Sequence, residues 1–170
     1  MDKVLGSWLE ANWERARGLA EASDLLDLDR LGRQHFVARF RCKGLVRGSE
    51  GDVREACRFD VGYWFSDRHL REVNPAQVVS WLRPAQVFHP NVKPPFCCLG
   101  PIEPGTSLVD LIYRTYEVIS YQNVMPDERD ALNRAACQWA RNNQHRFPVD
   151  DRPLKRRSGE PRGQTLELPR

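Results

Sequence analysis

Apolar side chains near the start of the chain recur at helical spacing. The residues that share this face are Leu5, Leu9, Trp13, Ala16 and Ala20. A period close to that of an α-helix predicts a helix from Leu5 to about Ala22. Ser7 and Glu10 are spaced like a capping box, which would start this helix one turn in. Residues 23–33 mix leucines with aspartates and are predicted to be the ragged end of the helix or a second short helix.

The period then changes from helical to alternating. Apolar and polar side chains alternate over residues 36–42 and again over 59–65, which predicts two half-buried strands. Residues 78–82 are predicted as a third strand, and the glycine-rich stretch 44–52 as a turn. Three short strands at this spacing favour an antiparallel meander over a βαβ arrangement.

A proline-rich stretch separates the predicted strands from two predicted helices. Six prolines between Pro84 and Gly105 exclude a helix there, and the apolar residues among them favour a packed loop. The helices are expected from Ser107 to about Ser120 and from Asp127 to about Asn143, with Asp127 as the cap of the second. The fold class is therefore α+β. We expect one domain over residues 1–148, followed by a polar, basic tail over 149–170 that is mobile or loosely packed.

Composition narrows the range of functions. The chain has 170 residues, and 26 basic against 23 acidic residues leave a net charge of +3, too small to favour nucleic-acid binding. No apolar run is long enough to span a bilayer and no secretory signal is visible, so we expect a soluble, cytoplasmic protein without a membrane partner. Only four basic residues are lysines, and this bias towards arginine is typical of a GC-rich bacterial genome.

Five cysteines without regular spacing favour free thiols over a disulfide framework. Cys42, Cys57 and Cys137 each fall on an apolar stripe and are predicted to be core thiols. Cys97 and Cys98 lie in the proline-rich stretch, where a thiol is available for chemistry.

The most informative motifs lie between Val87 and Asn143. Phe88-His89-Pro90-Asn91-Val92 is followed shortly by Phe96-Cys97-Cys98-Leu99, and downstream by Asp130-Ala131-Leu132-Asn133. This series resembles the ubiquitin-conjugating enzymes, whose pattern is aromatic-His-Pro-Asn-aliphatic, then apolar-Cys-Leu, and later Asp-Pro-Leu-Asn. The interval from Asn91 to Cys98 is slightly shorter than is usual in that family, and Ala131 replaces a proline. Both departures are typical of a divergent, bacterial-type member.

The resemblance implies a fold, a reaction and partners. The fold would be UBC-like, the type of the ubiquitin-conjugating enzymes, with an N-terminal helix, an antiparallel β-meander, a long active-site loop and two C-terminal helices. A ubiquitin-like protein, or another protein's C-terminus, would be carried as a thioester on Cys98 and passed to an amine of an acceptor protein, without a cofactor. An activating enzyme would dock on the N-terminal helix near Arg15 and Arg17. Bacterial relatives of the family occur in antiviral defence operons.

Each residue of the motif has an expected role. Cys98 is the expected nucleophile, because a thiolate attacks and leaves readily. The Asn91 amide either stabilises the oxyanion or orders the loop. Asp130 is either an acidic group near the thiol or a first-turn carboxylate favoured by the helix dipole. His89, Pro90 and Cys97 are expected to support the loop, with Cys97 pointing away from Cys98.

Two other functions stay open at this stage. The same fold could be a non-catalytic binding partner, although the presence of Cys98 disfavours it. A thiol hydrolase of such conjugates is the other alternative, with Cys98, His89 and an acid brought together in space. No metal site is expected from His89, Cys97 and Cys98, since structural zinc prefers separated pairs of ligands.

Overall fold

The N-terminal helix begins earlier than its predicted cap. A computed structural model describes residues 2–156 of the chain. Helix α1 spans Lys3–Glu21, and the Asp2 carboxylate caps it by accepting the Val4 N–H at 3.0 Å. The predicted capping box at Ser7 and Glu10 is therefore wrong, because an aspartate was available one turn earlier. The predicted inward face is largely confirmed, with Leu5, Leu9, Ala16 and Leu19 buried.

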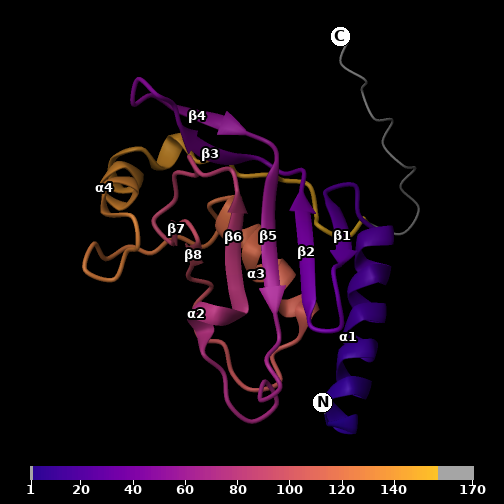
Figure 1. The fold of residues 1–170 in the computed structure, drawn as a ribbon. Helices are drawn as coiled ribbons and strands as arrows, with labels where there is room; N and C mark the ends of the chain where they lie inside the picture. Colours follow the sequence, from indigo (N-terminus) through magenta and orange to yellow (C-terminus); the bar gives the residue numbers. More distant parts are fainter. Residues whose placement is uncertain (1, 157–170) are drawn as a thin grey trace.

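An antiparallel sheet of six strands forms the centre of the molecule (Figure 1). Its strands, in spatial order, are β1 (Leu26–Arg30), β2 (His35–Phe40), β5 (Phe59–Trp64), β6 (Val79–Arg83), β8 (Phe96–Cys97) and β7 (Val92–Lys93). A one-turn helix, α2 (Pro75–Val78), leads directly into β6. The α+β class and the antiparallel meander are confirmed, and the sheet is wider than the three strands predicted.

The first strand occupies the segment that was predicted to be helical. Residues 26–30 alternate leucines with aspartates, and the two aspartates reach arginines of the neighbouring chain segment. Asp27 pairs with Arg41 at 2.6 Å and Asp29 pairs with Arg39 at 2.5 Å. These partners lie in and just after β2, outside residues 23–33, so the pattern of that segment alone does not reveal them.

A two-stranded arm projects beyond one end of the sheet (Figure 1). It consists of β3 (Gly44–Arg47) and β4 (Val53–Ala56), so the predicted turn over 44–52 is correct only after Arg47. Gly44 is required by packing, since a Cβ there would lie 2.6 Å from the Phe59 ring and 2.9 Å from the Ile119 carbonyl oxygen. Cys57 follows β4 and is exposed, so its prediction as a core thiol is wrong, whereas Cys42 and Cys137 are buried.

The helix α3 (Leu108–Ile119) lies behind the sheet in Figure 1 and packs against α1. Ser107 caps it, as the predicted start requires, and the Asn12 carboxamide of α1 accepts the Leu108 N–H at 3.1 Å. The main core fills the space between α1, the sheet and α3. Its fully buried members include Leu9, Phe36 and Leu111.

The last helix, α4 (Arg134–Asn142), starts seven residues after its predicted cap, Asp127. The Asn133 carboxamide caps it by accepting the Ala136 N–H at 3.1 Å. Asp127 instead pairs with Arg129 at 2.7 Å in an irregular turn. A single 3₁₀ turn, η1 (Gln144–Arg146), follows α4. Between α4 and the two-stranded arm lies a small core, whose buried residues are Leu45, Phe88, Tyr121, Ala136 and Ala140.

The start of the predicted tail packs against the body of the protein. Leu154 is 2% exposed, the Tyr116 hydroxyl donates to the Asp150 and Arg152 carbonyls at 3.0 and 2.6 Å, and the Arg156 N–H donates to Ala22 at 2.9 Å. The remainder of the tail, from residue 157, lies outside the described residues. Across residues 2–156 no helix is long and apolar enough to cross a membrane.

Candidate active site

The segment from Phe88 to Leu99, which we call the thiol loop, is bonded to β3 and to the start of α4. The Phe88 N–H donates to the Leu45 carbonyl at 2.9 Å, which joins the loop to β3. The Asn133 N–H at the start of α4 donates to the Pro90 carbonyl at 3.1 Å. Within the loop, the Cys98 N–H donates to the Asn91 carbonyl at 2.8 Å, so the two ends of the predicted motif lie side by side.

His89 is buried and holds the turn of the thiol loop. Its Nδ1 accepts the Asn91 N–H at 3.0 Å, and its ring stands edge-on to Tyr121 with 4.3 Å between ring centres. Burial lowers its pKa to about 3, so the imidazole is neutral near pH 7 and, because Nδ1 accepts, carries its proton on Nε2. Nε2 has no hydrogen-bond partner among the described residues. The ring is thus sealed in the loop and is unsuited to act as a general base on Cys98.

Tyr121 fixes the start of the loop, a contribution that the sequence did not single out. It is a non-glycine residue with a positive φ of 59°, and its hydroxyl donates to the Phe88 carbonyl. Its ring also packs on Phe147, at 4.9 Å between ring centres. Burial raises the pKa of this phenol, so it stays protonated and remains a donor. An αL backbone in a bulky residue persists only where the surroundings hold it.

Both ends of the Asn91 carboxamide are used to order the site. Its Nδ2 donates to the Cys98 carbonyl at 3.2 Å, and its Oδ1 accepts the Met125 N–H at 2.7 Å. The side chain thereby joins the cysteine segment to the chain that leads into α4. This geometry favours the loop-ordering role for Asn91 over that of an oxyanion donor.

The two adjacent cysteines differ in accessibility. Cys97 is buried, and burial raises the pKa of its thiol to about 12. Cys98 is only partly buried, at the point where the chain leaves β8. Since the thiolate is the reactive form and must meet its substrate, Cys98 is the thiol suited to chemistry.

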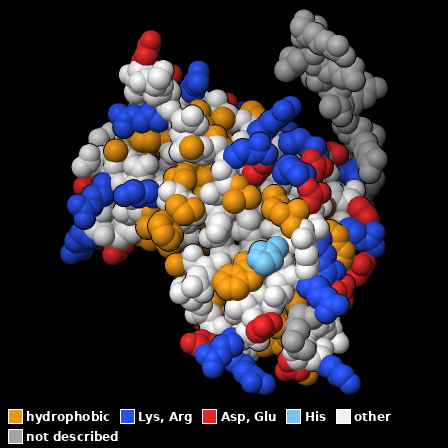
Figure 2. Space-filling model, viewed as in Figure 1, with side chains coloured by type: hydrophobic (Ala, Val, Ile, Leu, Met, Phe, Trp, Pro, Cys, Tyr) orange, Lys and Arg blue, Asp and Glu red, His pale blue; other side chains and the backbone are white. Residues whose placement is uncertain are grey.

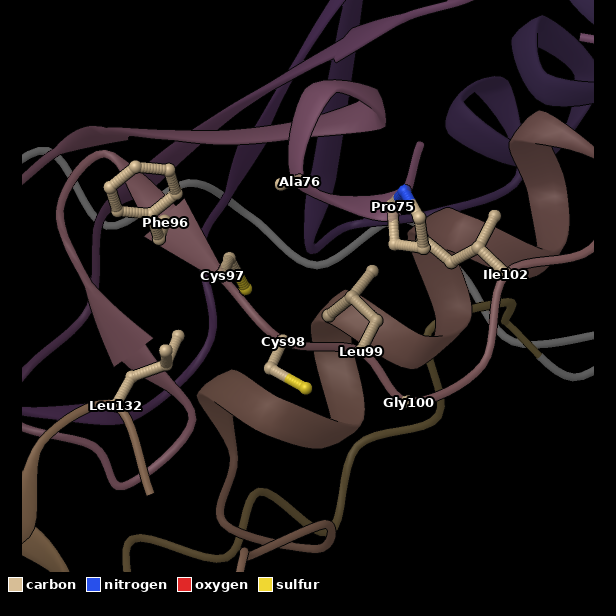
Figure 3. A pocket seen from close by; sticks show the side chains of 9 residues that line it. All are labelled: Pro75, Ala76, Phe96, Cys97, Cys98, Leu99, Gly100, Ile102 and Leu132. Carbon is tan, nitrogen blue, oxygen red and sulfur yellow. The ribbon is translucent and has the colours of Figure 1, made fainter. Parts of the chain in front are cut away.

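Cys98 lies in the wall of a hollow of about 200 Å³, which we call the thiol pocket (Figure 3). Both cysteines and Gly100 line it, although Cys97 was expected to point away from Cys98. The other lining residues are apolar: Pro75, Ala76, Phe96, Leu99, Ile102 and Leu132. In Figure 2 the outline of the molecule is indented between the part that holds α4 and the part that holds α2. These walls come from three segments that are far apart along the chain, 75–76, 96–102 and 132, which explains why the sequence did not reveal the pocket.

Asp130, the third predicted catalytic residue, is exposed in the irregular turn before α4 and does not line the thiol pocket. Two residues further along, Leu132 reaches the pocket in its place. Because α4 starts at Arg134, Asp130 is not a first-turn carboxylate either. The structure therefore brings together Cys98 and Asn91, with His89, Pro90 and Cys97 as support, and leaves Asp130 outside.

Within residues 2–156, no group of three or more His, Cys, Asp or Glu side chains is close enough to hold a metal ion. No known family model matches the chain, and no curated protein matches it significantly.

Proposed function

We propose that this protein is an acyl carrier and transferase that holds the C-terminus of another protein as a thioester on Cys98 and passes it to an amine. The observation that carries the proposal is the placement of one partly exposed thiol at the end of a bonded loop, open to a pocket. A purely structural cysteine would be buried in the manner of Cys42 or Cys137.

The reaction has two steps. In the first, the Cys98 thiolate attacks the carbonyl carbon of an incoming thioester, and the thiolate of the donor leaves. Little driving force is needed, because a thiol is exchanged for a thiol. In the second, a neutral amine attacks the same carbonyl, the Cys98 thiolate leaves, and the proton of the amine passes to solvent or to the departing sulfur. An amide forms, and Cys98 is restored.

The order of elements supports the ubiquitin-conjugating type of fold. A helix, an antiparallel meander, a loop with the thiol and two further helices follow one another, as the resemblance implies. Under this proposal the donor is a ubiquitin-like protein or another protein C-terminus, and the activating enzyme docks on α1 near Arg15 and Arg17. The protein acts in the cytoplasm of a bacterium, and its gene lies in an antiviral defence operon. Asn91 is a positioning residue, and no proton transfer is assigned to Asp130.

The test uses a synthetic peptide that ends in Gly-Gly as a thioester of 2-mercaptoethanesulfonate. We expect intact-mass spectrometry to detect an acyl adduct on the protein that excess thiol removes. In a Cys57→Ala background, which removes the exposed thiol after β4, the adduct should form on the Cys97→Ala variant and be absent from the Cys98→Ala variant. Added lysine should then receive the acyl group as an amide.

Each alternative function gives a different result. Equal adduct formation on the Cys98→Ala variant would rule out the assignment of the nucleophile. Release of the free peptide acid, in preference to the lysine amide, would favour the thiol hydrolase. Absence of any adduct on the wild-type protein would favour a non-catalytic binding partner.

A further inference from the structure

The thiol pocket combines a reactive thiol with walls that are almost entirely apolar. Apart from the two cysteines and Gly100, its lining is apolar, and no charged side chain of the described residues takes part. Figure 3 shows Leu132 on one side of Cys98, and Leu99, Ile102 and Pro75 on the other. Binding in an apolar hollow of this kind is favourable when an apolar group displaces the water from it, because apolar surface is then removed from solvent.

The rim of the pocket is apolar and partly open to solvent. Phe96 is 50% exposed and Leu132 is 36% exposed, although most large apolar side chains of the chain are buried. Both flank the cysteine segment, one from β8 and one from the residue before the cap of α4. Apolar side chains that gather at a concave, reactive site are typical of a ligand-binding surface.

The size of the pocket limits what can enter it. Sites for whole small molecules usually occupy roughly 300–1,000 Å³, so a hollow of about 200 Å³ suits a single side chain. A group tethered to Cys98 through a thioester cannot move far from the sulfur, since an extended residue spans only about 3.5 Å. The side chain that enters must therefore belong to a residue very near the thioester carbonyl.

We infer that the thiol pocket selects acyl donors whose next-to-last residue has an apolar side chain. This inference rests on the proposed thioester chemistry and adds a substrate class to it. The last residue itself remains small, because a bulky side chain beside the carbonyl would hinder attack by the thiol. The apolar side chain of the preceding residue then packs against Leu132, Ile102 and Phe96 while the carbonyl lies at the Cys98 sulfur.

The experiment compares three peptide thioesters of equal length that end in Leu-Gly, Gly-Gly and Asp-Gly. The rate of adduct formation on Cys98 is divided by the rate of exchange of the same thioester with N-acetylcysteine, which corrects for intrinsic reactivity. We expect this ratio to be about tenfold to a hundredfold higher for Leu-Gly than for Gly-Gly, the range typical of burying one leucine side chain. The Asp-Gly thioester should give the lowest ratio.

Two variants assign the preference to the pocket. Leu132→Ala, a change at a partly exposed residue, should reduce the preference for Leu-Gly, and Ala76→Phe should fill the pocket and abolish it. Leu31→Ala is the matched control, because Leu31 is 70% exposed in the turn between β1 and β2 and should leave the preference unchanged.

The outcomes separate the inference from the proposed function. Adducts that form at equal normalised rates with Leu-Gly and Gly-Gly would overturn the inference and leave the proposed function standing. Failure of all three thioesters to acylate Cys98 would overturn both. A preference that appears only in the second step, for amines with long apolar stems, would assign the pocket to the acceptor and overturn the inference.

Discussion

The main core and the small core hold the molecule together by different means. The main core is built from large apolar side chains such as Phe36, Leu9 and Leu111, and two layers of structure cover it. The small core is a cluster around Phe88, the first residue of the thiol loop, and Tyr121. The Tyr121 hydroxyl donates to the Phe88 carbonyl and so ties this core to the loop. The two cores meet at the thiol loop, because Val92, Cys97 and Leu99 belong to the main core and Phe88 belongs to the small core. We therefore expect large apolar side chains of the main core to set the stability of the fold, and the hydrogen bond from Tyr121 to set the closure of the thiol loop.

The largest effect is expected from a cavity in the main core. Leu111→Ala removes a fully buried side chain from α3 and should lower the free energy of unfolding by about 2–5 kcal/mol. Urea denaturation measures the loss. The alkylation rate of Cys98 by iodoacetamide in the folded protein should stay unchanged, since no bond of the thiol loop is altered. A parallel change in that rate would show that the packing of the main core also positions Cys98.

An intermediate effect is expected from the buried histidine beside the small core. His89 has a folded-state pKa of about 3, against about 6.5 when unfolded, so below pH 6.5 the unfolded state binds more protons. Its contribution to stability is complete above pH 6.5 and is lost as the pH falls towards 3, by about 1.4 kcal/mol for each pH unit.

Urea denaturation at pH 7 and pH 5 checks this pH dependence. Between these values the wild type should lose about 2 kcal/mol more stability than His89→Gln, which removes the titrating group. Some pH dependence should remain in the variant, because burial also lowers the pKa of His69, which packs against Phe65. Equal losses in both proteins would mean that His89 is accessible to protons in the native state.

The smallest effect comes from a matched pair of tyrosines, one in each core. The Tyr121 hydroxyl donates to the Phe88 carbonyl, and the Tyr63 hydroxyl donates to Thr115 Oγ1 at 2.8 Å. Tyr121→Phe and Tyr63→Phe should each cost about 0.5–1.5 kcal/mol. In the Cys98→Ala background, only Tyr121→Phe should raise the alkylation rate of buried Cys97, by about fivefold, because of these two hydroxyl bonds only that of Tyr121 is made to the thiol loop.

Peptide mass spectrometry after alkylation measures the rate at Cys97. The Tyr63→Phe variant is the control for the loss of a buried hydroxyl elsewhere in the fold. An equal increase at Cys97 in both variants would show that this thiol is exposed by global unfolding and not by opening of the loop.

The elements that the sequence predicts well are those whose signal is local. The apolar spacing around Leu9 and Leu111 and the alternation around Phe36 and Val61 mark α1, α3, β2 and β5, whose bounds agree closely with the structure. Strand β1 was not predicted because its aspartates pair with Arg39 of β2 and with Arg41 just after β2. The start of α4 was misplaced because Asp127 and Asn133 are both good caps, and packing chooses between them.

In the candidate site, too, the features with a local signal could be predicted and those that depend on distant segments could not. The contact between Asn91 and Cys98 involves two parts of a motif that is compact in sequence, so the sequence already indicated that the two residues lie close together. The thiol pocket and the role of Tyr121 depend on segments far apart along the chain, and no local pattern indicates them. Asp130 was assigned from its position in a motif, and the late start of α4 leaves it out of the pocket.

The packed segment 150–156 has a practical consequence for anyone who trims the chain. The polar composition after Pro148 favours that position as a boundary for truncation. However, the Asp150 carboxylate accepts the Lys43 N–H at 3.0 Å, and Leu154 belongs to the main core. Truncation at that boundary would remove the acceptor of the Lys43 N–H just before β3 and leave the Tyr116 hydroxyl without its acceptors. Shortened versions should therefore keep the residues through Arg156.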